Sequence, residues 1–222
     1  MKLLLVSGPW GSGTTAVAGL LDRLGAVGFG PYFMSNDPRT PNTYEFLPFM
    51  DLVRRYVSVS TLSYRESRPG DLEAELRTLR SRIERQEFGA YDPASGPPIF
   101  LKYPPSAFVL PQICDTFDVK LISVIRPLRQ IEQTRLRRGW PPEFGKRGAE
   151  VIYRHMSRVL NAHLHPHMKI KYEELLRSPL EVAQRLVQFA ELGAGPERIE
   201  AAARFVQRAS PQFAQVSRNA AP

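Results

Sequence analysis

Cysteine is almost absent from this chain, and so is any long hydrophobic run. The single cysteine, Cys114, excludes an internal disulfide and is typical of proteins from a reducing compartment. No apolar stretch approaches the roughly 20 residues that a membrane-spanning helix needs. The apolar run near the start, residues 3–6, is too short for the core of a signal peptide. We therefore expect a cytoplasmic protein without stable membrane insertion.

Acidic residues are also scarce relative to basic ones. The 222 residues include 30 Lys or Arg against 22 Asp or Glu, which gives a formal net charge of +8. A positive field favours anionic partners such as nucleotides, phosphate or sulfate. The basic residues are scattered and no nucleic-acid-binding motif is present, so we do not expect a nucleic-acid partner.

Strand-like and helix-like segments alternate along the chain. Apolar runs predict strands at residues 3–6, 99–102, 119–125 and 168–172. Helical spacing predicts helices at residues 14–24, 71–88, 106–117, 127–138, 145–164, 180–192 and 196–207. This alternation predicts one α/β domain over residues 1–222. Its expected fold is a three-layer, P-loop-like arrangement with a central parallel sheet of four to five strands flanked by helices.

Residues 28–64 are rich in aromatic side chains and proline. We expect a loop to about Pro41, followed by one or two helices. The aromatic side chains belong either to the core or to the wall of a ligand pocket.

A glycine-rich turn separates the first predicted strand from the first predicted helix. Glycines let backbone N–H groups turn toward an anion, and the positive end of the helix dipole points to the same place. Hydroxyl groups in this turn add further donors. We therefore predict a phosphate-binding loop formed by Pro9, Trp10, Gly11, Ser12, Gly13, Thr14 and Thr15.

Two departures distinguish this loop from that of the P-loop nucleotidases. Those proteins carry a lysine where Thr14 stands here. They also use an aspartate at a strand end to hold magnesium, whereas the clearest later strand is followed by Arg126. A small-molecule kinase that uses Mg-ATP stays an alternative, and both departures count against it.

Three segments resemble the sulfotransferases that use 3'-phosphoadenosine 5'-phosphosulfate (PAPS). The Ser-Gly-Thr-Thr stretch that begins at Ser12 matches the second half of the family's loop motif, which binds the 5'-phosphosulfate. Arg126, Arg129 and Thr134 fall in the register of the family's strand-end arginine, second arginine and later hydroxyl. The first and last of these bind the 3'-phosphate in the family. Lys102 matches the lysine of the family's Lys-Thr-His stretch.

This resemblance implies a bacterial-type sulfotransferase that uses PAPS and no metal. The reaction would move a sulfuryl group to a hydroxyl or amine of a small molecule or glycan by in-line displacement with a general base. The product would be adenosine 3',5'-bisphosphate. In this sequence Gly11 replaces the basic residue of the loop, and Pro104 replaces the family's catalytic histidine. A catalytically inactive nucleotide-binding module is therefore a further alternative.

The expected general base is Glu45, because it resembles the glutamate of an Asn-x-x-Gly-aromatic-Glu stretch in some bacterial members. Nearby Phe46 and Phe49 would desolvate its carboxylate. Asp37 and His155 are reserve candidates. We expect Lys102 to steady the sulfuryl group or the leaving oxygen.

Two further groups of basic residues lie in the second half of the chain. His163, His165 and His167 alternate, but they lie in a short connection around Pro166, so we do not expect a metal site. Residues 210–222 are expected to form a flexible tail. Late basic residues bind the 3'-phosphate in the family, which suggests the same role for Arg208 or Arg218.

Overall fold

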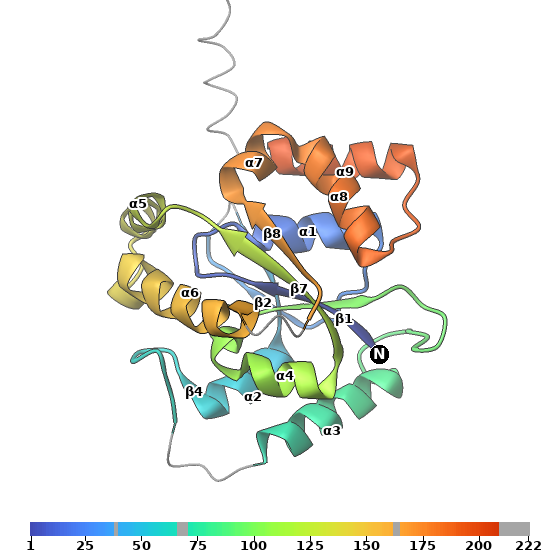
Figure 1. Cartoon of the computed structure of the whole chain (residues 1–222), viewed down its shortest axis with the longest axis horizontal. Coiled ribbons are helices and arrows are strands. Elements are labelled where there is room, and N and C mark those ends of the chain that lie inside the picture. Colours follow the sequence, from blue (N-terminus) through green and yellow to red (C-terminus); the bar gives the residue numbers. More distant parts are fainter. Residues whose placement is uncertain (38–39, 66–70, 162–164, 209–222) are drawn as a thin grey trace, which may run out of the picture.

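The computed structural model describes residues 1–37, 40–65, 71–161 and 165–208. A central sheet lies between two layers of helices (Figure 1). Its four strands are β1 (Lys2–Ser7), β6 (Ile99–Lys102), β7 (Asp118–Ile125) and β8 (His167–Lys171), in the order β6-β1-β7-β8. All three pairings are parallel. The predicted α/β fold, with a parallel sheet flanked by helices, is confirmed.

The first strand shows why its sequence is a continuous apolar run. Successive side chains of a strand point to opposite faces of the sheet. Leu3 and Leu5 pack into the core on one face, and Leu4 and Val6 pack into the core on the other. Because helices cover both faces, neither set of side chains can be polar.

The helices divide between the two faces of the sheet (Figure 1). One face carries α1 (Thr14–Leu24), α7 (Tyr172–Arg177), α8 (Pro179–Ala190) and α9 (Pro196–Arg208). The other face carries α2 (Leu47–Tyr56), α3 (Leu72–Glu84), α4 (Leu110–Thr116) and α6 (Lys146–Asn161). Helix α5 (Leu128–Arg138) follows β7 directly, and two 3₁₀ turns, η1 (Pro104–Val109) and η2 (Pro142–Phe144), complete the described helices.

The prediction for residues 28–64 was wrong in part. Strand β2 (Tyr32–Met34) lies within the expected loop, and its antiparallel partner β3 (Asn42–Phe46) replaces the start of the expected helical stretch. Helix α2 follows, and then a short ribbon of β4 (Val57–Ser58) and β5 (Ser63–Tyr64). These strands are too short to show a period of two in the sequence. Side-chain bonds help to fix the hairpin: Thr43 Oγ1 donates to Phe33 O at 2.6 Å.

Other boundaries differ by smaller amounts. The expected helix over residues 106–117 is divided into η1 and α4, because prolines at 104, 105 and 111 interrupt the helical hydrogen bonds. Helix α3 ends at Glu84 rather than at residue 88. Just after this end, Gln86 takes a positive φ of 62°, which does not continue a right-handed helix. Helix α7 was not predicted, and residues 162–164, which were expected to end α6, lie outside the described part of the chain.

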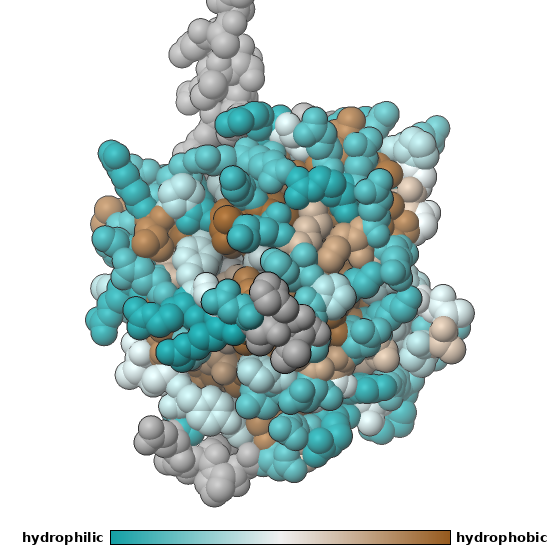
Figure 2. Space-filling model, in the orientation of Figure 1, coloured by the Kyte–Doolittle hydropathy of each residue, from teal (hydrophilic) through white to brown (hydrophobic). Residues whose placement is uncertain are grey.

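Hydrophilic side chains predominate on the face shown in Figure 2, and hydrophobic ones form scattered patches. Within the residues described, no helix combines the length and hydropathy needed to cross a membrane.

Candidate functional site

The loop between β1 and α1 wraps around the start of the helix. Gly11 and Gly13 have φ values of 76° and 103°, which favour glycine over any other residue. A Cβ atom at Gly13 would lie 2.3 Å from the Tyr172 ring, so only a hydrogen fits there. The N–H groups of Thr14 and Thr15 precede the first hydrogen bonds at this end of α1, which Ala16 and Val17 donate to the carbonyl oxygen of Gly13. The loop therefore has the backbone geometry of an anion site.

The predicted loop residues differ in their exposure to the adjacent cavity. Trp10, Gly11, Gly13, Thr14 and Thr15 line it. Pro9 and Ser12 are buried and are not among the cavity-lining residues described. Ser12 holds the turn together through its backbone N–H, which donates to the carbonyl oxygen of Pro9 at 3.1 Å.

Arg126 lies at the carboxyl end of β7 and reaches the loop. Its Nη1 atom donates to the carbonyl oxygen of Gly11 at 2.8 Å and to Thr134 Oγ1 at 3.1 Å. Its Nε atom donates to Gln130 Oε1 at 3.0 Å. The strand end, the loop and helix α5 thus meet at one guanidinium, which places Arg126 and Thr134 together.

The guanidinium of Arg126 is partly buried and lies near other positive charges. Its guanidinium lies 4.2 Å from the centre of the Tyr172 ring. Burial lowers the pKa of Arg126, and the nearby charges of Arg137 and Arg138 lower it further. A guanidinium that is removed from water and lies near other cations is strongly stabilised when an anion binds beside it.

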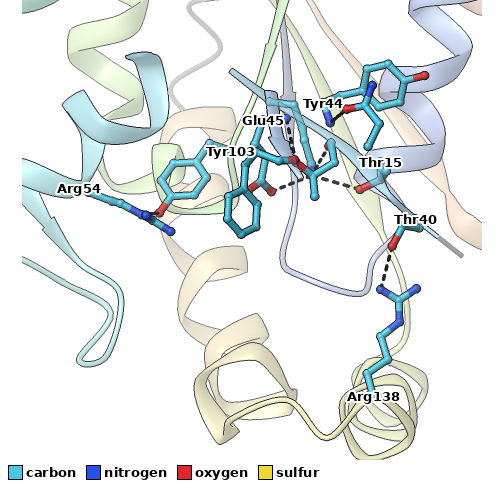
Figure 3. A network of polar contacts seen from close by, with 11 residues as sticks. Thr15, Thr40, Tyr44, Glu45, Arg54, Tyr103 and Arg138 are labelled. Atoms are coloured by element: carbon cyan, nitrogen blue, oxygen red, sulfur yellow. Dashed lines mark hydrogen bonds and ion pairs between the residues drawn. The ribbon is translucent and has the colours of Figure 1, made fainter. Parts of the chain in front are cut away.

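Lys102 and Glu45 form a buried ion pair. The Nζ atom of Lys102 lies 2.7 Å from Glu45 Oε1, and the two side chains are only 3% and 7% exposed. The same ammonium donates to Thr15 Oγ1 at 3.1 Å and to the carbonyl oxygen of Thr43 at 3.0 Å (Figure 3). Its three donors therefore join the end of β6, the hairpin strand β3 and the first turn of α1.

A cavity of about 770 Å³ connects these groups. It opens at the carboxyl ends of β1, β6 and β7, the edge where parallel α/β sheets bind ligands. Lys102, Glu45, Arg126 and Thr134 all line it. Its further lining residues, beyond the loop, are Ala16, Arg23, Phe33, Ser35, Thr40, Pro41, Asn42, Thr43, Tyr44, Arg137, Arg138, Trp140, Phe144, Tyr172 and Phe205.

Aromatic rings form one wall of this cavity. Trp10 stacks on Phe144 with 4.2 Å between ring centres, and Trp140 meets Phe144 edge-on at 6.1 Å. The aromatic segment at residues 28–64 contributes less than expected, because only Phe33 and Tyr44 of its rings line the cavity. The rings of Phe29, Phe46, Phe49 and Tyr56 lie in the core.

The reserve candidates for the base lie in other surroundings. The Oδ2 atom of Asp37 is 3.1 Å from Arg138 Nε, so this carboxylate already has a cationic partner. His155, which belongs to α6, packs against Phe108 of η1. Burial lowers the pKa of His155, and the positive charges of Arg158 and Arg154 lower it further. Neither residue is among those described as lining the cavity.

The other basic candidates contribute nothing to this cavity in the part of the chain described. Arg129 does not line it. His163, the Arg208 side chain and Arg218 lie outside the described residues and side chains. Among the residues that are described, no group of three or more His, Cys, Asp or Glu is arranged to hold a metal ion.

Several lining residues escaped the sequence analysis. Arg137 and Arg138 come three and four positions after Thr134, which is the spacing of neighbours on one helix face. That spacing was available in the sequence. Trp140 reaches the cavity from the loop after α5, Phe144 from η2 and Tyr172 from the start of α7, and no local pattern indicates this.

Comparison with known proteins gives structural matches only. No family model and no curated protein matches the sequence. The sulfotransferase domain of the Synechococcus PCC 7002 olefin synthase is similar, with a TM-score of 0.58, 17% identity, and coverage of 97% of this chain and 82% of that one. Sulfotransferase STF9 from Mycobacterium avium gives a TM-score of 0.58 at 16% identity, covering 94% and 68% of the two chains.

The sulfotransferase domain of the curacin biosynthetic pathway gives a TM-score of 0.54 at 17% identity, covering 89% and 76%. All three similarities extend over most of both chains. The fold of this chain is therefore the one found in these sulfotransferase domains.

Proposed function

We propose that this chain, which has the sulfotransferase fold, is a sulfotransferase that transfers a sulfuryl group from PAPS to a hydroxyl or amine acceptor. One observation carries the proposal: Arg126 joins the glycine loop to Thr134, and the same cavity contains the Lys102–Glu45 pair. An anion site and a paired acid and base group thus share one chamber.

The residues present fit the two charged ends of the donor. The loop from Gly11 to Thr15 offers N–H groups and the helix dipole to the 5'-phosphosulfate. The absence of a Cβ atom at Gly13 lets the Tyr172 ring pack directly against the loop. Arg126 and Thr134 offer charge-assisted and hydroxyl hydrogen bonds to the 3'-phosphate.

Glu45 and Lys102 supply the chemistry of transfer in this proposal. Glu45 accepts the acceptor's proton while the acceptor oxygen or nitrogen forms its bond to sulfur. The sulfur–oxygen bond to the phosphate breaks, and its electron pair stays on the phosphate oxygen. Lys102 lies 3.1 Å from Thr15 Oγ1 in the loop. Its ammonium thus provides the positive charge that Gly11 cannot supply.

The kinase alternative is less consistent with this site. The loop lacks the lysine at Thr14, and Arg126 occupies the strand end where a magnesium-binding aspartate is expected. The inactive-module alternative is opposed by Glu45, because its carboxylate lines the cavity beside the loop, within reach of an acceptor bound there. The acceptor would be a small molecule or glycan.

Calorimetric titration tests the donor site. Wild type should bind adenosine 3',5'-bisphosphate without metal and more tightly than Mg-ATP. Arg126→Ala should weaken that binding by roughly 2–5 kcal/mol, because the phosphate loses a partly buried charged partner. Arg129→Ala removes the same charge one turn from Arg126 and should have little effect. Preference for Mg-ATP, or binding indifferent to Arg126, would replace this proposal with the kinase alternative.

A further inference from the structure

The last turn of α5 carries three arginines with different environments. Arg135 pairs with Glu132 at 2.7 Å and donates to the carbonyl oxygen of Trp140. Arg138 pairs with Asp37 and lies over the Trp140 ring at 4.6 Å. Arg137 lines the cavity and is exposed, and it has no ion pair or hydrogen bond with any residue in the described part of the chain. Two of these cations thus have structural partners, and the side chain of Arg137 lines the cavity.

The position of Arg137 on the helix points it to Arg126. Gln130 accepts from Arg126 Nε, and Thr134 accepts from Arg126 Nη1. Gln130, Thr134 and Arg137 are spaced at intervals of four and three, so they form one row along α5. The positive charge of Arg137 is close enough to lower the pKa of Arg126. This row of side chains therefore begins at Gln130 beside Arg126 Nε, continues with Thr134, and ends at the guanidinium of Arg137.

Two cations this close together repel each other unless an anion lies between them. A phosphate monoester carries about −1.5 to −2 charges at pH 7, so one guanidinium neutralises only part of it. The other cations of the cavity are engaged elsewhere. Lys102 is paired with Glu45, Arg138 with Asp37, and Arg23 lies 3.6 Å from the centre of the Phe205 ring.

We propose that Arg137 is the second cation for the 3'-phosphate and selects nucleotides that carry this group. Arg126 and Thr134 would hold the phosphate from the strand end and the helix, and Arg137 would close on it from the next turn of α5. This inference rests on the function proposed above and adds to it a residue that determines donor specificity. Since Arg137 is exposed, it can move onto the ligand without disturbing the core.

Matched titrations of two ligands test this role. Adenosine 3',5'-bisphosphate and adenosine 5'-monophosphate differ only by the 3'-phosphate. We expect Arg137→Ala to weaken bisphosphate binding by about 10- to 100-fold and monophosphate binding by less than about twofold. Arg137→Lys, which keeps the charge but not the planar fork, should lose less. Arg129→Ala, an equal loss of charge on the same helix but outside the cavity, should change neither affinity.

The outcomes separate this inference from the proposed function. If wild type prefers the bisphosphate and Arg137→Ala keeps that preference, the role of Arg137 is overturned and the donor site stands. An equal loss for both ligands would also overturn it, since the effect would then not depend on the 3'-phosphate. If wild type itself shows no preference, the proposed donor is wrong, and the role of Arg137 is overturned with it.

Discussion

The side chains of the site that tolerate substitution least are the carboxylate of Glu45 and the ammonium of Lys102, which form a buried ion pair. The Nζ atom of Lys102 is 2.7 Å from Glu45 Oε1, and the two side chains are only 3% and 7% exposed. Removing one member of such a pair strands the charge of the other, and this costs roughly 3–5 kcal/mol. The pair therefore contributes to folding as well as to the proposed chemistry, and experiments must separate the two effects.

Glu45→Gln keeps the shape of the side chain and an oxygen that can accept from Lys102. We expect it to reduce turnover by roughly 10²–10⁴-fold, because the base is lost, while affinity for adenosine 3',5'-bisphosphate stays within a few-fold. Lys102→Ala should also cut turnover strongly, leave bisphosphate binding in place, and lower the free energy of unfolding by roughly 3–5 kcal/mol. Steady-state assays, titration and chemical denaturation measure these effects. Near-normal turnover in either variant removes that residue from the mechanism.

Two glycines with positive φ provide a second comparison between residues. Gly13 has φ 103° with the Tyr172 ring in the way of a Cβ, whereas Gly139 has φ 64° and open space around it. We expect Gly13→Ala to abolish bisphosphate binding and to destabilise the fold, since the loop or Tyr172 must move. Gly139→Ala should cost only about 1 kcal/mol of backbone strain and keep binding. Equal effects in thermal unfolding and titration would contradict this account of the loop.

Among the elements, the β2–β3 hairpin depends on α5 for its position over the site. Arg138 contacts Asp37 and Thr40, which flank the turn of the hairpin, and β3 carries Glu45 (Figure 3). The contacts are partly exposed, and such links contribute about 0–1 kcal/mol to global stability. Their main effect is therefore local: they hold the strand that bears the proposed base.

We predict that Arg138→Gln accelerates hydrogen exchange of amides in β2 and β3 severalfold, because local opening of the hairpin becomes easier. The melting temperature should change by only a few degrees. Arg129→Gln, on the same helix, should leave the hairpin amides unchanged. Exchange rates that are equal in wild type and Arg138→Gln would show that the hairpin is held by its own pairing and by the core beneath it.

For the whole molecule, the proposed ligand binding is linked to folding, because the proposed anion site combines residues at the ends of β1, β7, α1 and α5. A ligand that binds only the folded state stabilises it by about 2.7 kcal/mol at 100 times its dissociation constant. For a chain of this size we expect adenosine 3',5'-bisphosphate to raise Tm by roughly 5–10 °C. A chelator should leave the shift unchanged, since the proposed site uses no metal. Thermal unfolding scans measure this rise in Tm, and a rise that appears only when magnesium is added would contradict the proposal.

The central sheet could be predicted because its information is local. The apolar run in β1, the β-branched run in β7 and the glycines around α1 each specify their structure over a few residues. Alternation of strands and helices then favours a parallel sheet. Because parallel strands have their carboxyl ends at the same edge, the loops after β1, β6 and β7 lie there together. The sequence by itself therefore determined the fold class and the glycine loop, and its resemblance to the PAPS sulfotransferases supplied the candidates Arg126, Thr134, Glu45 and Lys102.

Tertiary structure alone decided how these candidates combine. The sequence named Glu45 and Lys102 separately, 57 positions apart, and only folding of the hairpin against β6 makes them an ion pair. The hairpin was missed because its short strands are held by side-chain bonds and by contact with the core, and neither leaves a periodic pattern. The partners of Arg135 and Arg138 likewise became visible only in three dimensions. Pairing of distant charges depends on burial and geometry, which no local run of residues encodes.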